Sequence, residues 1–174
     1  MYNPLLVKGV ENFEKKIESY AKLLLHFGLR FQKGWALAIE CPNISPDLAR
    51  ACAKEAYKSG ARDVMMSWFD PYIAREKYLY SDISNLGKEF NWPDYARNKY
   101  KQDMAFLVIE SYNTDFANDV PNDRRALYNK GTSEIFTSFK RGLEYPYTIC
   151  VGASREWAIK VFPDMEPDEA YIKL

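Results

Sequence analysis

The chain has 174 residues, of which 47% are apolar, and this is enough to bury the core of one folded domain. Its 24 lysines and arginines balance its 24 aspartates and glutamates. A net charge near zero disfavours binding to nucleic acids or to anionic membranes, because both require a basic excess.

The cysteines and the amino terminus indicate the compartment. Cys41, Cys52 and Cys150 are odd in number, far apart, and form no CxxC motif, which is typical of reduced, buried thiols and not of a disulfide framework. Near the amino terminus the apolar run Leu5–Val7 is too short for a signal peptide, and no stretch approaches transmembrane length. We therefore expect a cytoplasmic protein.

The first predicted element is an amphipathic helix over about residues 11–29, with an apolar face formed by Phe13, Ile17, Tyr20, Ala21 and Leu24. The continuous apolar run GWALAIEC at 34–41 then predicts a strand that is covered on both faces. Ser45 suits the N-cap of a second helix, and Pro46 suits its first helical position.

Three further apolar runs predict buried strands at 63–69, 104–111 and 147–154. A polar helix over about 121–142 precedes the last of them, and we expect its apolar contacts to be Leu127, Ile135, Phe136 and Phe139. Strands that alternate with helices predict βαβ units. We therefore expect an α/β fold of the doubly wound type, with a mostly parallel sheet of about four or five strands and helices on both faces.

An aromatic-rich insertion at about 71–103 interrupts this alternation. It predicts two or three short helices, broken near Gly87 and Pro93. Its aromatic residues either staple an elaborate crossover to the sheet, or form a cover over a cleft or a contact surface for another domain or subunit. The sequence leaves both interpretations open.

Residues suited to catalysis or metal binding are sparse. The single histidine, His26, lies in the last turns of the first predicted helix, where a structural role is favoured. No HExxH motif or other His/Cys cluster is present. We expect the acidic residues in turns and first helical turns to serve as caps, although a carboxylate site for Mg²⁺ stays open; they are Asp119, Asp123, Asp164, Glu166, Asp168 and Glu169.

Phosphate-binding motifs are also missing, since neither GxGxxG nor GxxxxGK[ST] occurs. The segments CPNISPD and GASREW lead from predicted strands into helices, at the edge where doubly wound sheets usually bind ligands. Ser154 lacks a GxSxG context, so we expect it to be the N-cap of a helix over 154–162 and not a nucleophile.

The order of several segments resembles a known family. The relevant stretches are Leu-x-x-Gly-Leu-x-x-x-x-Gly at 25–34, Ala-Tyr-x-x-Gly-Ala-x-x-Val at 56–64 and Trp-Ala-x-x-Val-Phe-Pro-Asp at 157–164. Together they are similar to the N-terminal region of the thermophilic-type metalloaminopeptidases, the family of aminopeptidases T, S and II. The resemblance runs from about Phe13 to Leu174, and it departs from the family at 153–154, where Ala-Ser replaces a Pro-Thr-type step.

This resemblance implies a two-domain, cytosolic, homodimeric exopeptidase that removes N-terminal residues from peptides with two divalent metal ions (Zn, Co or Mg). The family's metal ligands belong to the C-terminal domain, so no catalytic, cofactor-binding or metal residue is assigned to this chain. We expect an N-terminal α/β domain at 1–166 and, at 167–174, the start of a helix leading to an absent catalytic domain. The alternative is a self-standing module that binds a small ligand or assembles with partners, with its ligand near 41–47 or 152–156.

Overall fold

The computed structural model describes residues 4–88, 92–100, 102–111, 115–142 and 145–174, although the side chains at 4–10, 92, 132 and 134–142 lie outside this description. A four-stranded sheet has the strand order β2-β1-β3-β4, and every pair of neighbours is parallel. The strands are β1 (Ala36–Pro42), β2 (Asp63–Phe69), β3 (Met104–Glu110) and β4 (Tyr147–Val151). The predicted α/β fold class is therefore confirmed.

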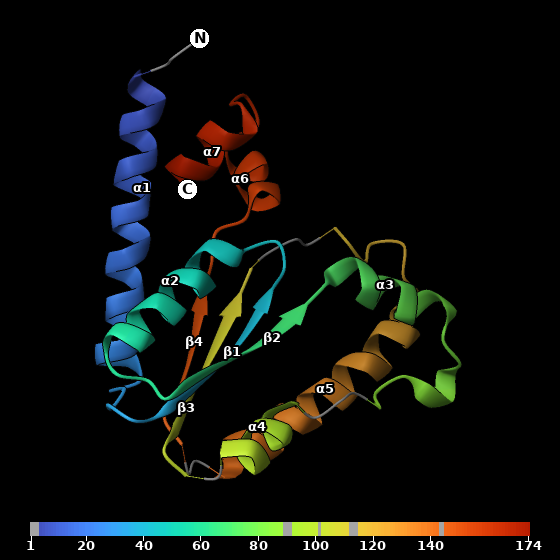
Figure 1. Cartoon of the computed structure of the whole chain (residues 1–174). Coiled ribbons are helices and arrows are strands. Elements are labelled where there is room, and N and C mark those ends of the chain that lie inside the picture. Colours follow the sequence, from blue (N-terminus) through green and yellow to red (C-terminus); the bar gives the residue numbers. More distant parts are fainter. Residues whose placement is uncertain (1–3, 89–91, 101, 112–114, 143–144) are drawn as a thin grey trace.

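Helices cover both faces of this sheet (Figure 1). On one face lie α1 (Pro4–Lys22), a π-helical continuation (Leu23–Gly28) and α2 (Pro46–Lys58). The other face carries α4 (Trp92–Tyr100), beside α5 (Asn122–Gly142) and α3 (Pro71–Tyr80). Two short helices, α6 (Arg155–Val161) and α7 (Pro167–Lys173), follow β4 and lie against α1.

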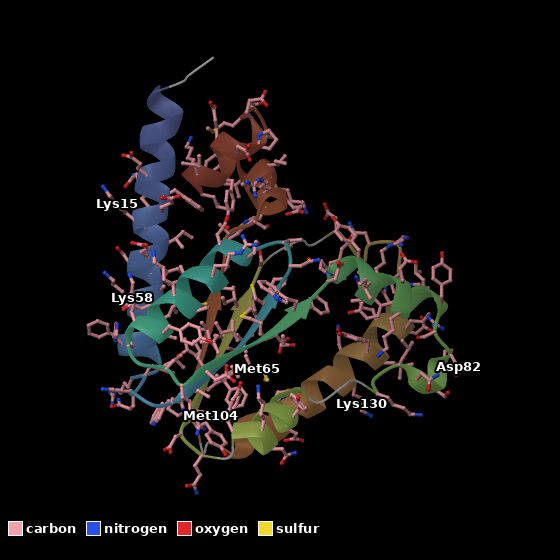
Figure 2. All side chains as sticks on the ribbon, in the orientation of Figure 1. Lys15, Lys58, Met65, Asp82, Met104 and Lys130 are labelled. Atoms are coloured by element: carbon pink, nitrogen blue, oxygen red, sulfur yellow. The ribbon has the colours of Figure 1, made fainter. Side chains whose placement is uncertain are left out.

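The core has two apolar layers because β1 is buried on both sides. Leu37, Ile39 and Cys41 point toward α1 and α2, whereas Ala36 and Ala38 point toward α4. All five side chains are fully buried, which explains why the run at 34–41 is apolar without alternation. Figure 2 shows Met65 and Met104 near the amino ends of their strands, and both belong to the layer under α4.

Several local predictions differ from the structure. The first helix begins at Pro4 and not at Glu11. Ser45 occupies the N-cap position of α2, but its side chain makes no cap bond, because its Oγ donates to the Ala153 carbonyl at 2.6 Å. Leu127 is 40% exposed and is not the apolar contact that was predicted. The side chains of Ile135, Phe136 and Phe139 lie outside the described residues.

The insertion contains α3, a 3₁₀ turn at Ile83–Asn85 and α4. Gly87 separates the turn from α4 and has a φ of +84°, which a glycine adopts without strain. A Cβ on Gly131 of α5 would lie 2.1 Å from the Gly87 carbonyl oxygen, so the two backbones touch. The predicted boundary near Pro93 is also present, because α4 begins at Trp92 and Pro93 lies in its first turn, where proline is tolerated.

The described aromatic residues of the insertion are partly packed and partly exposed, and Phe90 and the Trp92 side chain lie outside the description. Tyr100 packs on the sheet beside Met104, whereas Tyr78 packs edge-on against Tyr128 of α5 at a centroid distance of 4.5 Å. Other tyrosines are largely exposed, namely Tyr72, Tyr80 and Tyr95. The insertion is thus held partly by the sheet and partly by α5, and it leaves aromatic surface open.

Candidate functional site

The strand order reverses between β1 and β3, because the chain passes from β1 through α2 to β2 on one side and later returns to β3 on the other. In open α/β sheets, ligands bind outside the carboxyl ends of the strands at such a point. The candidate site is therefore the space beyond Pro42 and Glu110, where β1 and β3 end.

A cavity of about 290 Å³ occupies this position, the switch point of the sheet, and we call it the acidic hollow. It is lined by Glu40, Pro42, Ile44, Phe69, Pro71, Val108, Ile109, Glu110, Ser111 and Phe116. Glu40 is opposite Val108 in the β1–β3 register, so Glu110 is its diagonal neighbour on the same face of the sheet. Apolar walls thus surround two carboxylates, a combination that suits a ligand with a positive charge and an apolar body.

The electrostatics of this face support a cationic ligand over an anionic one. Burial raises the pKa of Tyr147 on β4 to about 12, and the charges of Glu110 and Glu40 add to this effect. Both carboxylates therefore lie close enough to Tyr147 for their charges to raise its pKa. The Oγ atom of Ser111 is buried and has no hydrogen-bond partner among the described residues. A phosphate group would meet repulsion here, which agrees with the missing phosphate-binding motifs.

The two loops that the sequence offered as alternative ligand sites, 41–47 and 152–156, touch each other at Gly152, and the first of them contributes Pro42 and Ile44 to the cavity. A Cβ on Gly152 would lie 2.4 Å from the Ser45 Oγ and 2.9 Å from the Ile109 Cγ2. Ser154 is fully buried at the N-cap of α6, where its side chain accepts from the Trp157 N–H at 3.2 Å. Ser154 is therefore a capping residue, as predicted.

His26 joins the π-helical segment to α2, since its Nε2 lies 2.8 Å from the Glu55 Oε1. The contact crosses from one helix to the next, which is a structural role. Asp119 does not cap a helix as predicted, because it binds the Arg75 guanidinium. Asp168 lies in the first turn of α7 and also pairs with Arg155 at 2.8 Å.

The three cysteines are free and buried. Burial is the main cause that raises the pKa of Cys41 and of Cys150 to about 12, and it also raises the pKa of Cys52. Thiols with such values are protonated at neutral pH and are poor nucleophiles and poor metal ligands.

A second cleft, of about 560 Å³, lies between α1, α2 and α7. Several of its polar groups are paired with one another: Lys54 binds Glu18 at 2.7 Å, and the Tyr171 hydroxyl donates to the Asp47 Oδ2 at 2.8 Å. This pairing neutralises part of the charge that the cleft could offer to a ligand. The cleft was not predicted from the sequence, because it depends on how α7 packs against α1.

The described part of the chain offers no site for a metal ion. No three side chains of the His, Cys, Asp and Glu types come together there in a way that could hold one. The described residues therefore do not fit a two-metal centre. In the same part of the chain, no helix is both long and apolar enough to cross a membrane.

These features define a doubly wound α/β domain with an acidic hollow at its switch point. The model of the thermophilic metalloprotease (M29) family matches residues 13–174, and the chain belongs to this family. The resemblance inferred from the sequence motifs is thereby confirmed.

Curated relatives support the same assignment. The chain is 29% identical to aminopeptidase PepS of Streptococcus thermophilus in an alignment 174 positions long, which covers 94% of this chain and 40% of that protein. It is 27% identical to aminopeptidase AmpS of Bacillus subtilis, with 92% of this chain and 40% of that protein covered. Aminopeptidase 2 of Geobacillus stearothermophilus is also 27% identical, with 95% and 41% covered.

A solved structure shares the fold. Wild-type AmpT from Thermus thermophilus matches with a TM-score of 0.80 and 23% identity, covering 93% of this chain and 42% of that one. The chain thus spans about two-fifths of the length of the relatives that it matches.

Proposed function

We propose that this chain is the non-catalytic N-terminal domain of a cytosolic, metal-dependent aminopeptidase that releases N-terminal amino acids from peptides. One observation carries the proposal: nearly the whole chain matches proteins named aminopeptidases, yet it covers only about 40% of their length. The remaining length of those relatives has room for a catalytic domain.

In this proposal residues 1–166 form the N-terminal domain, and 167–174 begin the helix that leads to the catalytic domain. Two divalent metal ions (Zn, Co or Mg) are held by that second domain, where they activate water for attack on the first peptide bond. The present chain helps to wall the active-site cavity and fixes the pairing of the two domains. The complete enzyme is a homodimer that acts on peptides.

The test is an activity assay on the isolated chain. With leucine p-nitroanilide and added Co²⁺ or Zn²⁺, the chain alone should release no p-nitroaniline. A metal-dependent rate that disappears in a chelator would contradict the assignment of catalysis to another domain. Sequencing the source gene beyond the codon for Leu174 gives a second test. A further reading frame with Glu, His and Asp residues able to form a two-metal site is expected, and a stop codon would contradict it.

The acidic hollow at the switch point favours one alternative, a module that binds a small ligand by itself. Glu40 and Glu110 beside apolar walls suit a primary amine with an apolar chain. In a thermal-shift assay this alternative predicts stabilisation by an alkylamine such as isoamylamine, and loss of the effect in Glu40→Gln. No shift at millimolar amine would remove it.

A further inference from the structure

The sheet has two outer strands, β4 and β2, and they differ in what lies beside them. The outer edge of β4 faces α1 and its π-helical continuation (Figure 1). The Tyr20 hydroxyl is hydrogen-bonded to the backbone of Val151, and Gly28 lies so close to β4 that a Cβ there would be 3.0 Å from the Thr148 Oγ1. These contacts cover the edge of β4 in part, since Ile149 on the same strand is 43% exposed.

The other outer strand, β2, is paired only with β1. In a parallel ladder, alternate residues direct their backbone N–H and C=O groups to the same side. The Phe69 carbonyl accepts from the Asn43 N–H at 2.8 Å on the β1 side. It follows that the backbone groups of Val64, Met66 and Trp68 face away from the sheet.

The first of these outward positions is closed by side chains. The Val64 N–H donates to the Tyr57 hydroxyl at 3.2 Å and to the Asp63 Oδ1 at 2.9 Å. Among the described residues, no hydrogen bond reaches the outward backbone groups of Met66 or Trp68. The open part of the edge is thus limited to Met66–Trp68.

This open edge is short, but it lacks two of the features that usually prevent pairing with another strand, namely charged side chains and proline. Residues 64–69 contain no charge and no proline, and Trp68 is 48% exposed beside the open groups. Donors and acceptors that repeat every second residue, about 6.6 Å apart, are matched by another extended backbone and not by a compact ligand. The lack of charge disfavours nucleic acid and charged ligands.

We propose that the outer edge of β2 at Met66–Trp68 binds an extended, uncharged peptide segment, which joins the sheet as an additional parallel or antiparallel strand. Backbone hydrogen bonds provide the affinity, and the Trp68 ring packs on a side chain of the bound segment. Recognition through the backbone makes binding tolerant of the peptide's sequence. This proposal goes beyond the function proposed above and does not depend on it.

The experiment uses the ¹⁵N-labelled chain and an acetylated, amidated hexapeptide of alternating threonine and valine. Saturating peptide should slow amide hydrogen exchange at Met66 and Trp68 by about tenfold or more, because their N–H groups become bonded. Met65 and Ser67 already bond to β1 and should change little. The same hexapeptide with N-methyl groups on alternate residues should not bind, and binding of equal strength would overturn the proposal.

Met66→Pro removes one outward donor without removing a bond to β1, and edge strands tolerate such a proline. It should weaken peptide binding about fivefold. Ile149→Pro places the same residue on the outer edge of β4 and should leave the affinity unchanged. Circular dichroism checks the folding of both variants, and if Met66→Pro does not fold, the N-methylated peptide decides.

Two other outcomes would overturn the proposal. One is the absence of amide shifts at 64–69 up to millimolar peptide. The other is protection of Met66 and Trp68 without peptide that rises with protein concentration, because the occupant of the edge would then be a second copy of the chain.

Discussion

The contact between Ser45 and Gly152 joins the two loops at the carboxyl edge of the sheet, and it allows a quantitative prediction. Gly152→Ala places a Cβ 2.4 Å from the Ser45 Oγ and 2.9 Å from the Ile109 Cγ2. Overpacking of this kind costs about 1–3 kcal/mol. Ser45→Ala removes the bond to the Ala153 carbonyl and leaves a part-buried acceptor without its partner, which costs about 1–3 kcal/mol.

The double variant separates this explanation from a general loosening of the loops. In Ser45→Ala the clashing oxygen is gone, so Gly152→Ala should then cost at least about 1 kcal/mol less than it does in the parent chain. The contact with Ile109 remains, so the cost should not vanish. Urea unfolding of the four proteins, followed by circular dichroism, measures the cycle, and with a slope of about 2 kcal/mol per M each single change lowers the midpoint by about 0.5–1.5 M. Additivity within about 0.5 kcal/mol would refute the reasoning.

Three further predictions concern packing, pH and thiol reactivity. Gly131→Ala should destabilise the chain by about 1 kcal/mol or more, although alanine has the better helix propensity, because the new Cβ meets the Gly87 carbonyl. Ser133 is exposed on the same helix, so Ser133→Ala should be neutral or stabilising in the same urea assay. Hydrogen bonds from Tyr100 and Lys99 lower the pKa of Asp63, so its stabilising effect should be present above about pH 4 and disappear as the pH falls further. The thermal midpoints of the parent chain and Asp63→Asn should accordingly converge below about pH 4, and a constant difference would contradict this. Because Cys41, Cys52 and Cys150 are buried, a disulfide reagent for thiols should react slowly with the native chain and rapidly with all three cysteines in denaturant. Rapid labelling of the native chain would contradict the buried positions of these cysteines.

The central strands β1 and β3 were predictable because burial on both faces leaves a strong local signal. The outer strand β2 is only partly buried, so the prediction of a buried strand at 63–69 is right about the strand and wrong about its burial. The runs at 34–41, 63–69 and 104–111 contain little polar sequence, and each became a strand within two residues of the predicted start. The role of Ser45 was not predictable in the same way. Its N-cap position is a local property, but its hydrogen bond goes to Ala153, which is distant in sequence and becomes a neighbour only after the sheet forms.

The acidic hollow was not predicted, although the sequence does carry a signal for it. Two of the apolar runs, GWALAIEC and MAFLVIES, share the pair Ile-Glu just before their last residue. A charged residue near the end of a strand buried on both faces must either find a partner or face an opening at the carboxyl edge. Because β1 and β3 are parallel neighbours, the shared pair places Glu40 and Glu110 on one face at the switch point.

That placement has a consequence for how substitutions in this chain should be interpreted. Ile39 and Ile109 point toward α1 and α2 and are fully buried, whereas the adjoining glutamates point to the opposite face and line the hollow. Changes at the isoleucines should lower stability through lost packing, by about 1 kcal/mol for Ile→Val. Changes of either glutamate to glutamine keep the shape and remove one negative charge. A functional effect of Glu40→Gln or Glu110→Gln in the complete enzyme, without a change in unfolding midpoint, would therefore assign the hollow a role in binding and not in folding.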